Sequence, residues 1–190
     1  FFFEVNYEKQ LKKDNIYQYF SAISFVLFMF PKFPLIPAFP WLEADFSEIP
    51  AFFAASLMGP AAGFAVVLIK NVIHLAVTTT GMVGELSNFL LGAAFVLSFG
   101  IFYKYVLKFK NNFAKIVLSV VIAAFFQIIT AVLVNYFIMV PLYMGEGFDA
   151  VNYIIAGVIP FNAVKDAIVA AAFIIVYKVL GNTLNRLVNK

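Results

Sequence analysis

Apolar residues in this chain run in long stretches that few charges interrupt, rather than alternating with polar residues. Stretches of this kind are typical of helices that cross a membrane, and a crossing helix needs roughly 20 residues. The last four stretches are long enough, whereas the first two need residues from their flanks or shielding by protein. The pattern predicts six transmembrane helices, at residues 16–30, 49–58, 61–79, 86–105, 113–140 and 153–180.

The segment between the first two helices, residues 32–48, is apolar but cannot form a regular helix. Pro34, Pro37 and Pro40 lack the backbone N–H that a helix interior requires. Irregular backbone at membrane depth is tolerated where it packs on protein or lines a pocket, so we expect this loop to cover a pocket. Proline fits the first turn of a helix, and we expect the ordered part of the sixth helix to begin near Pro160.

The composition agrees with an all-α integral membrane protein. Hydrophobic residues make up 64% of the chain and charged residues 12%, whereas a soluble domain carries about 25% charged residues. One chain of 190 residues cannot hide that much apolar surface in its own core, so lipid must be its solvent. The sequence shows no strong internal repeat, and we expect residues 1–190 to form a single transmembrane domain.

Basic residues predict the orientation. With six crossings, both ends and the even-numbered connections lie on one side, and ten of the 13 basic residues fall there. The opposite side carries Lys32, while Lys70 and Lys165 lie inside the apolar stretches. Lysine and arginine concentrate in cytoplasmic segments, so we expect both termini in the cytoplasm. The ten residues are Lys9, Lys12, Lys13, Lys104, Lys108, Lys110, Lys115, Lys178, Arg186 and Lys190.

Ionisable residues inside the apolar stretches are costly unless they face a partner or a cavity. The four such residues are Lys70, His74, Lys165 and Asp166. They are accompanied by amides at Asn71, Asn88, Gln127, Asn135 and Asn162. Helical periodicity places the polar residues of each helix on one face, and several lie towards the extracytoplasmic end. We infer a pocket on the outer side, with an aromatic lid and an amide-rich floor.

Structural interpretations compete with this one. A single asparagine in a membrane helix is more often a contact between helices than a ligand contact. His74 could share a polar groove with Glu48 or Glu85, and Asp166 could serve as the counter-ion of Lys165. A buried lysine needs a partner, and we favour a functional role for Lys165.

The pocket chemistry suits a neutral, flat and partly polar molecule. An asparagine side chain places a donor and an acceptor side by side, which matches an imide edge, and aromatic side chains can cover a ring face. The chain has no Walker A pattern and no cysteine, and its one histidine has no evident nucleophile beside it. We therefore expect no enzyme activity, no metal site and no resident cofactor.

Three segments resemble a known family. ADFSEIPAFFAASLMGPAAGFAVVLIKNVIH (residues 44–74) is similar to the first loop and helices two and three of the substrate-binding subunits, or S components, of energy-coupling-factor (ECF) vitamin transporters. GELSNFLLG (84–92) resembles the start of their fourth helix. PFNAVKDAI (160–168) resembles the sixth-helix segment of the riboflavin-specific members.

The resemblance implies a defined function. An S component of this type binds riboflavin from outside the cell and docks on a transmembrane coupling subunit (EcfT), which two ATPase subunits (EcfA and EcfA′) drive. Riboflavin is then a transported substrate and not a cofactor. Family members often carry an Ala-x-x-x-Ala docking pattern in helix one. Here Ala22 is followed four residues later by Val26, so the pattern is incomplete.

We expect riboflavin to bind between the 32–48 loop and the outer halves of helices four to six. Asn162 and Lys165 lie one helical turn apart and can hold one polar edge together. The loop supplies apolar cover and a carboxylate that can reach a polar group, and the amides of helices four and five suit the ribityl hydroxyls or the opposite edge. The candidate residues are Trp41, Leu42, Asp45, Phe46, Asn88, Asn135, Asn162 and Lys165.

Other functions remain open on the sequence alone. A proton-coupled secondary transporter of a small planar molecule would use Lys70, His74 and Asp166 as a relay and would need no ATPase. An S component for another vitamin would keep the fold and change the pocket. A purely structural membrane subunit would bind no small molecule.

Overall fold

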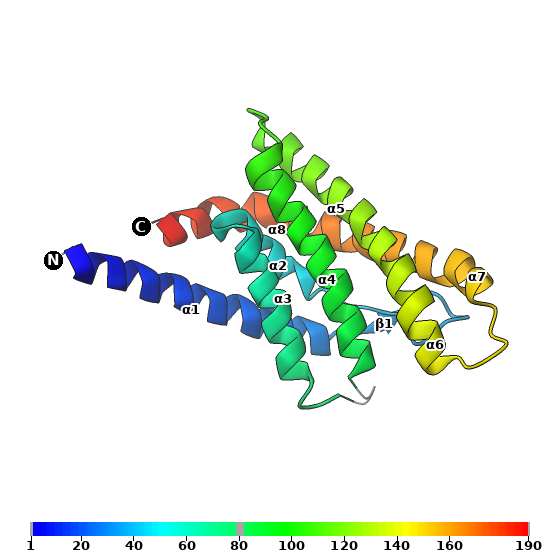
Figure 1. Cartoon of the computed structure of the whole chain (residues 1–190). Helices are drawn as coiled ribbons and strands as arrows, with labels where there is room; N and C mark the ends of the chain where they lie inside the picture. The colour runs from blue at the N-terminus through cyan, green and yellow to red at the C-terminus, as the bar shows by residue number, and fades with distance from the viewer. Residues whose placement is uncertain (1, 79–81, 190) are drawn as a thin grey trace.

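The computed structural model describes residues 2–78 and 82–189, and over these ranges the protein is a bundle of helices (Figure 1). The described chain contains six helical rods, three of which include a wider π-helical turn. The rods are α1 (Phe2–Met29); α2 (Glu48–Met58); α3 (Pro60–His74); α4 (Val83–Ile101) with η1 (Phe102–Val106); α5 (Asn112–Val134) with η2 (Asn135–Met139) and α6 (Val140–Tyr143); and α7 (Ala150–Tyr153) with η3 (Ile154–Val158) and α8 (Ile159–Asn189).

All six predicted stretches are helical, but the structure changes their limits. The first stretch, except its last residue Phe30, lies within the longer helix α1. Helix α3 ends at His74, and Thr79, where we expected the third helix to end, lies outside the described residues. Helix α8 begins at Ile159, next to Pro160 as expected, but α7 and η3 make the last rod helical already from Ala150.

A π-helical turn carries the last rod past Pro160. In η3 the backbone N–H of Ile159 donates to the carbonyl of Ile154, one residue further back than in an α-helix. The wider turn accommodates a residue that has no backbone N–H to donate. The turn η2 stands in the same way just before Pro141. Each proline is therefore the second residue of an α-helix, α6 or α8, that continues a rod already begun.

Three rods of the described chain are long and apolar enough to cross a membrane, at Val83–Val106, Asn112–Tyr143 and Ala150–Arg186. Helices α2 and α3 are apolar but shorter. Gly59 joins them with a φ of 112°, a conformation that favours glycine because it has no Cβ. Helix length and composition thus support three crossings, and the count of six stays a prediction.

Phenylalanine rings fill the centre of the bundle around α2. Phe52 is fully buried, and its ring centroid lies 4.7 Å from that of Phe95, 4.8 Å from that of Phe99 and 5.1 Å from that of Phe173. Helix α2 also packs against α1 and α3. The short helix is therefore surrounded by longer ones, which explains why it is apolar round most of its circumference.

Residues 32–48 form a loop that contains a small antiparallel hairpin. Strand β1 (Phe33–Pro34) pairs with β2 (Glu43–Ala44). The prediction that this segment is not helical is confirmed, although the pairing of the strands was not predicted. Phe39 and Leu42 pack against a hydrophobic cluster of the last two rods, whose buried members are Ala131, Val140, Tyr153, Ile154 and Val158. This packing fixes the loop over one end of the bundle.

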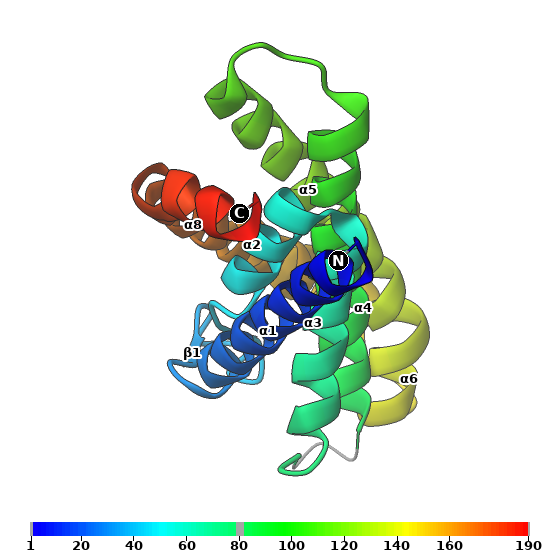
Figure 2. The same cartoon turned by 90° about the vertical axis from the view of Figure 1, so that its left-hand side faces the viewer.

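The amino-terminal end of α1 and the carboxyl-terminal end of α8 lie on the same side of the molecule (Figure 1, Figure 2). An even number of crossings requires this arrangement. The agreement does not test which side faces the cytoplasm, and the predicted orientation still rests on the basic residues.

Candidate ligand-binding site

A cavity of about 440 Å³ lies between the 32–48 loop, the first half of α4, the second half of α5 and the first part of α8. Pockets for small ligands usually measure roughly 300–1,000 Å³, so the volume suits a small organic molecule. Its acidic, basic and amide lining residues are Glu43, Glu48, Asn88, Gln127, Asn135, Asn162, Lys165 and Asp166.

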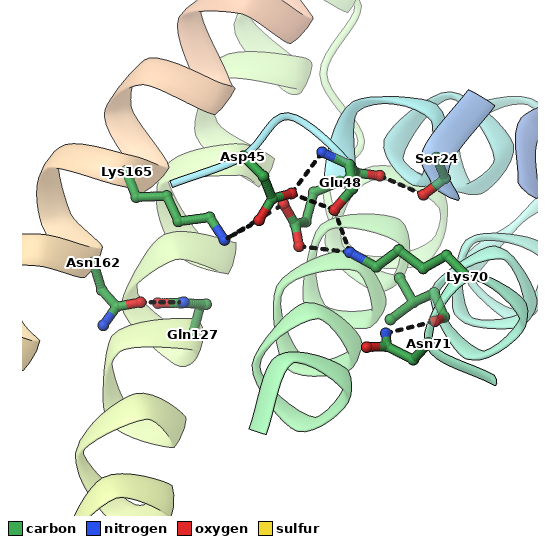
Figure 3. A network of polar contacts seen from close by, with 10 residues as sticks. Ser24, Asp45, Glu48, Lys70, Asn71, Gln127, Asn162 and Lys165 are labelled. Atoms are coloured by element: carbon green, nitrogen blue, oxygen red, sulfur yellow. Dashed lines mark hydrogen bonds and ion pairs between the residues drawn. The ribbon is translucent and has the colours of Figure 1, made fainter. Parts of the chain in front are cut away.

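Two buried lysines tie helices α3 and α8 to the place where the loop meets α2. The Lys165 ammonium lies 3.2 Å from Asp45 Oδ2 and 3.8 Å from Glu48 Oε2. The Lys70 ammonium donates to Glu48 Oε1 at 3.0 Å and also to the Ser47 hydroxyl. Figure 3 shows Asp45 and Glu48 between the two lysines. The end of the loop is therefore fixed to both helices by ion pairs.

Asp45 is held as a carboxylate by this network. Burial would raise its pKa, but the Lys165 and Lys70 ammonium groups and the hydrogen bonds from Ser47 outweigh burial and lower the pKa from 3.8 to about 2. The stabilisation that ionised Asp45 contributes is therefore present above its ordinary pKa and is lost as the pH falls towards about 2. At neutral pH Asp45 serves as a counter-ion.

The counter-ions of Lys165 are Asp45 and Glu48 instead of its sequence neighbour Asp166. Neighbouring residues on a helix point about 100° apart, so the Lys165 side chain reaches across to the loop. Asp166 is 2% exposed, and neither of its carboxyl oxygens has a hydrogen-bond partner among the described residues. Pairing the two neighbours, which the sequence left open, is not what the structure shows.

Amide side chains link α5 to α8 along one wall of the cavity. Gln127 Nε2 donates to Asn162 Oδ1 at 2.8 Å, and Asn162 Nδ2 donates to the carbonyl of Val158 at 2.8 Å. Figure 3 shows this pair one helical turn from Lys165. Asn162 therefore joins two helices and also lines the cavity.

Aromatic side chains stand at the outer part of the cavity. Trp41 Nε1 donates to the Tyr153 hydroxyl at 3.2 Å, and this hydroxyl donates to Asn135 Oδ1 at 3.4 Å. The Phe39 ring centroid lies 5.8 Å from that of Trp41 and 5.3 Å from that of Tyr153. Trp41 is 53% exposed, so it stands at the rim between the cavity and the surface.

Six of the eight candidate residues line the cavity: Trp41, Leu42, Asn88, Asn135, Asn162 and Lys165. Asp45 and Phe46 do not line it. Asp45 binds Lys165, and Phe46 packs against Phe33 and the main hydrophobic core. Neither residue therefore lines the cavity, and the prediction that they contact the ligand is not tested by this geometry.

Several residues that line the cavity were not among the candidates, including the polar residues Glu48, Gln127, Tyr153 and Asp166. Tyr153 carries a polar tip in an apolar stretch, and this signal could have identified it. Asp166 was considered as a partner of Lys165 and as a member of a proton relay, but not as a ligand contact. Glu48 was considered only as a groove partner of His74, whose Nδ1 in fact lies 2.8 Å from Glu85 Oε1.

Comparison with known proteins identifies the family. The family model described as ECF transporter, substrate-specific component matches residues 19–177. The chain belongs to this family of S components. The resemblance of three short segments is thereby confirmed over most of the chain.

Curated relatives of this S component are named as transporters. The riboflavin transporter RibU of Staphylococcus aureus is 36% identical over 174 residues, which cover 88% of this chain and 89% of that protein. The riboflavin transporter FmnP of Bacillus subtilis is 30% identical over 181 residues, covering 88% and 91%. The expectation of a transport protein rather than an enzyme is therefore confirmed.

A solved structure shares the fold. It is described as the S component of a bacterial ECF transporter, and its similarity has a TM-score of 0.77 at 35% sequence identity. The match covers 92% of this S component and 98% of that chain. The helical bundle is therefore that of an ECF S component.

Proposed function

We propose that this S component binds riboflavin in the cavity beneath the 32–48 loop, as the specificity subunit for its ATP-driven uptake. The observation that carries the proposal is the cavity, where the aromatic rim of Trp41 and Tyr153 faces buried amide and charged groups. Riboflavin has a flat ring system with a polar edge and a hydroxylated side chain, which such a cavity suits. Relatives at 36% and 30% identity are named for riboflavin, which favours it over another vitamin.

Predicted residues that line the cavity keep their roles in this proposal. Asn162 and Lys165 hold one polar edge of the ring from adjacent turns of α8, and the Trp41 side chain covers the ring at the rim. Asn88 and Asn135 contact the remaining polar groups. Asn135 Oδ1 accepts a hydrogen bond from Tyr153, and its Nδ2 donates to the carbonyl of Ala131. A ligand that binds Asn135 would therefore replace one of these two hydrogen bonds.

The proposal includes partners and a membrane. A coupling subunit (EcfT) and two ATPase subunits (EcfA and EcfA′) supply the energy, in keeping with the family and with a sequence that has no Walker A pattern. We place the protein in the bacterial cytoplasmic membrane with six crossings and both termini in the cytoplasm. The distribution of basic residues and three rods of crossing length support this arrangement.

A self-sufficient proton-coupled transporter is less well supported. Its relay would connect Lys70, His74 and Asp166, but the first two are held in separate pairs. Lys70 contacts Glu48 at 3.0 Å, while His74, one turn further along α3, contacts Glu85 at 2.8 Å. Neither Lys70 nor His74 lines the cavity, and membership of the ECF family favours ATP as the energy source.

Single-cysteine variants test the orientation, since the chain has no native cysteine. We expect a membrane-impermeant maleimide added to intact cells to label Ala150→Cys and not Lys110→Cys. Residue 110 lies in the connection between η1 and α5 on the predicted cytoplasmic side, and residue 150 begins α7 on the opposite side. Broken membranes should label both variants. If intact cells label Lys110→Cys and not Ala150→Cys, the orientation in the membrane is the opposite of the one proposed.

Protein purified without added ligand is expected to be yellow and to show the visible absorption of a flavin. After the flavin is removed, riboflavin should quench the emission of Trp41, the one tryptophan of the chain, because Trp41 lines the cavity. The titration gives the dissociation constant. The proposed substrate would be refuted if the purified protein is colourless and its Trp41 emission responds to another vitamin but not to riboflavin. That result would still agree with membership of the family.

A further inference from the structure

Basic residues gather on two segments at the end of the bundle opposite the 32–48 loop. Residues 104–115, where the α4 rod ends and α5 begins, carry four lysines, and residues 178–190 of the last rod carry three basic side chains. The sequence has no aspartate or glutamate at residues 86–145 or 167–190. Both segments therefore keep their positive charge, and a partner that fits this surface is anionic.

Two of these lysines are held by aromatic rings instead of carboxylates. The Lys115 ammonium lies 4.5 Å from the ring centroid of Tyr103, and the Lys178 ammonium lies 4.5 Å from that of Phe113. Neither lysine forms an ion pair with a carboxylate in the described part of the chain. A ring face attracts an ammonium group without neutralising its charge. Both ammonium groups therefore keep their charge and N–H donors for an anion.

The two lysines belong to one cluster built from η1, α5 and α8. The Tyr103 hydroxyl of η1 donates to Asn112 Oδ1 at 3.0 Å and lies 3.3 Å from the Tyr177 hydroxyl of α8. Tyr177 directly precedes Lys178, and Asn112 directly precedes Phe113, whose ring holds the Lys178 ammonium. These contacts hold the start of α5 against α8, so the two ammonium groups lie in one small region of the surface.

Exposed apolar side chains alternate with lysines along the same surface. Tyr105 is 59% exposed, Phe109 is 49% exposed and Phe113 is 46% exposed. One rod of crossing length ends at Val106, and the next begins at Asn112. Aromatic rings and lysines mixed at the ends of crossing helices are typical of the boundary between membrane and water. The lysines that alternate with these rings are Lys104, Lys108 and Lys110.

We propose that this cluster binds the headgroup of an anionic phospholipid. Lys115 and Lys178 contact the phosphate from two helices, while the exposed rings lie among the upper parts of the acyl chains. In the proposed orientation the cluster faces the cytoplasmic leaflet, whose anionic lipids attract basic segments. The site is separate from the riboflavin cavity, which lies along the first half of α4 and the second half of α5. A bound lipid contacts η1, α5 and α8 together and stabilises their packing.

Native mass spectrometry of the full chain in detergent tests the inference. The protein is titrated with short-chain phosphatidylglycerol and with phosphatidylcholine of the same chain length. Both lipids carry a phosphate, but choline neutralises its charge. We expect phosphatidylglycerol to bind about 25-fold more tightly or better, as two lysines at about fivefold each imply. A higher concentration of ammonium acetate should reduce this preference, because salt screens exposed charges.

Substitutions assign the preference to the cluster. Lys115→Gln and Lys178→Gln are each expected to weaken phosphatidylglycerol binding about fivefold and phosphatidylcholine binding less than about twofold. Lys115→Arg and Lys178→Arg keep the charge and should bind both lipids as the unmodified protein does. Lys32→Gln is the matched control. The Lys32 ammonium also lies 4.5 Å from a ring centroid, that of Phe28, but Lys32 follows α1 at the loop end of the bundle. This variant should keep the full preference.

Four results would overturn the inference, and none of them depends on riboflavin. The first is equal affinity of the unmodified protein for the two lipids. The second is a preference that the two glutamine variants lower no more than Lys32→Gln does, because it would then arise elsewhere on the protein. The third is an equal loss for both lipids, because the lysines would then act through helix packing and not through the charge of the headgroup. The fourth is a normal lipid preference in glutamine variants that fail to assemble with the coupling subunit, which would assign the surface to a protein partner.

Discussion

Replacing Lys165 by methionine is expected to weaken riboflavin binding about 100-fold or more and to destabilise the protein by about 3–5 kcal/mol. The side chain is 11% exposed, and its ammonium lies 3.2 Å from Asp45 Oδ2 and 3.8 Å from Glu48 Oε2. Without the charge, Asp45 loses its nearest counter-ion in a buried place. The 32–48 loop also loses its tie to α8, and the ligand loses a charged donor.

The Asp45→Asn exchange separates the two effects of Lys165→Met. In the double variant neither partner is charged, so most of the lost stability should return. The riboflavin affinity should stay low, because the donor to the ligand is still missing. Denaturant unfolding in detergent measures the first quantity and Trp41 quenching the second. Full recovery of affinity in the double variant would show that Lys165 acts only through its ion pair with the loop.

Asn162→Ala is expected to lower riboflavin affinity about tenfold to a hundredfold. The substitution removes a polar contact to the ligand from the cavity wall. It also leaves Gln127 Nε2 without the acceptor that it reaches at 2.8 Å. The cavity wall therefore loses the Asn162 amide, and the Gln127 side chain loses the hydrogen bond that orients it. The same fluorescence titration measures the change, and the visible flavin retained during purification should fall in parallel.

Asn152→Ala is the matched control for Asn162→Ala. Asn152 belongs to the same rod, but its side chain is exposed and does not line the cavity. The capping hydrogen bond from Asn152 to Asp149 uses the backbone N–H, which alanine keeps. We expect this variant to bind riboflavin normally. If Asn162→Ala also binds within about twofold of the unmodified protein, the role of the first turns of α8 in binding is refuted.

The positions of the helices could be predicted from the sequence because lipid imposes a simple rule. A chain that must satisfy its backbone inside a bilayer forms helices wherever charges are few, and all six apolar stretches are helical. The prolines of the first loop likewise excluded a helix there. Pro160 marks the start of α8, but the helical turns before it were not predicted, since the hydrophobic pattern does not reveal a π-helical turn.

The polar residues of α8 could also be identified from the sequence. Asn162 and Lys165 stand out because polar groups inside an apolar stretch are costly and need a reason, and PFNAVKDAI resembles a known segment. Both line the cavity. Asn162 and Lys165 are three residues apart, so they lie on the same face of one helix. This relation can be predicted from the sequence of that helix alone.

Only the tertiary structure decided which residues meet across helices. It paired Lys165 with Asp45 from the loop, and left Asp166 buried without a hydrogen-bond partner in the described chain. It turned Phe46 into the core and brought Tyr153 to the rim. The periodicity of a helix determines which of its own residues share a face, but the residue opposite depends on how far the helices are shifted and rotated against each other. Packing of all the side chains together sets those shifts.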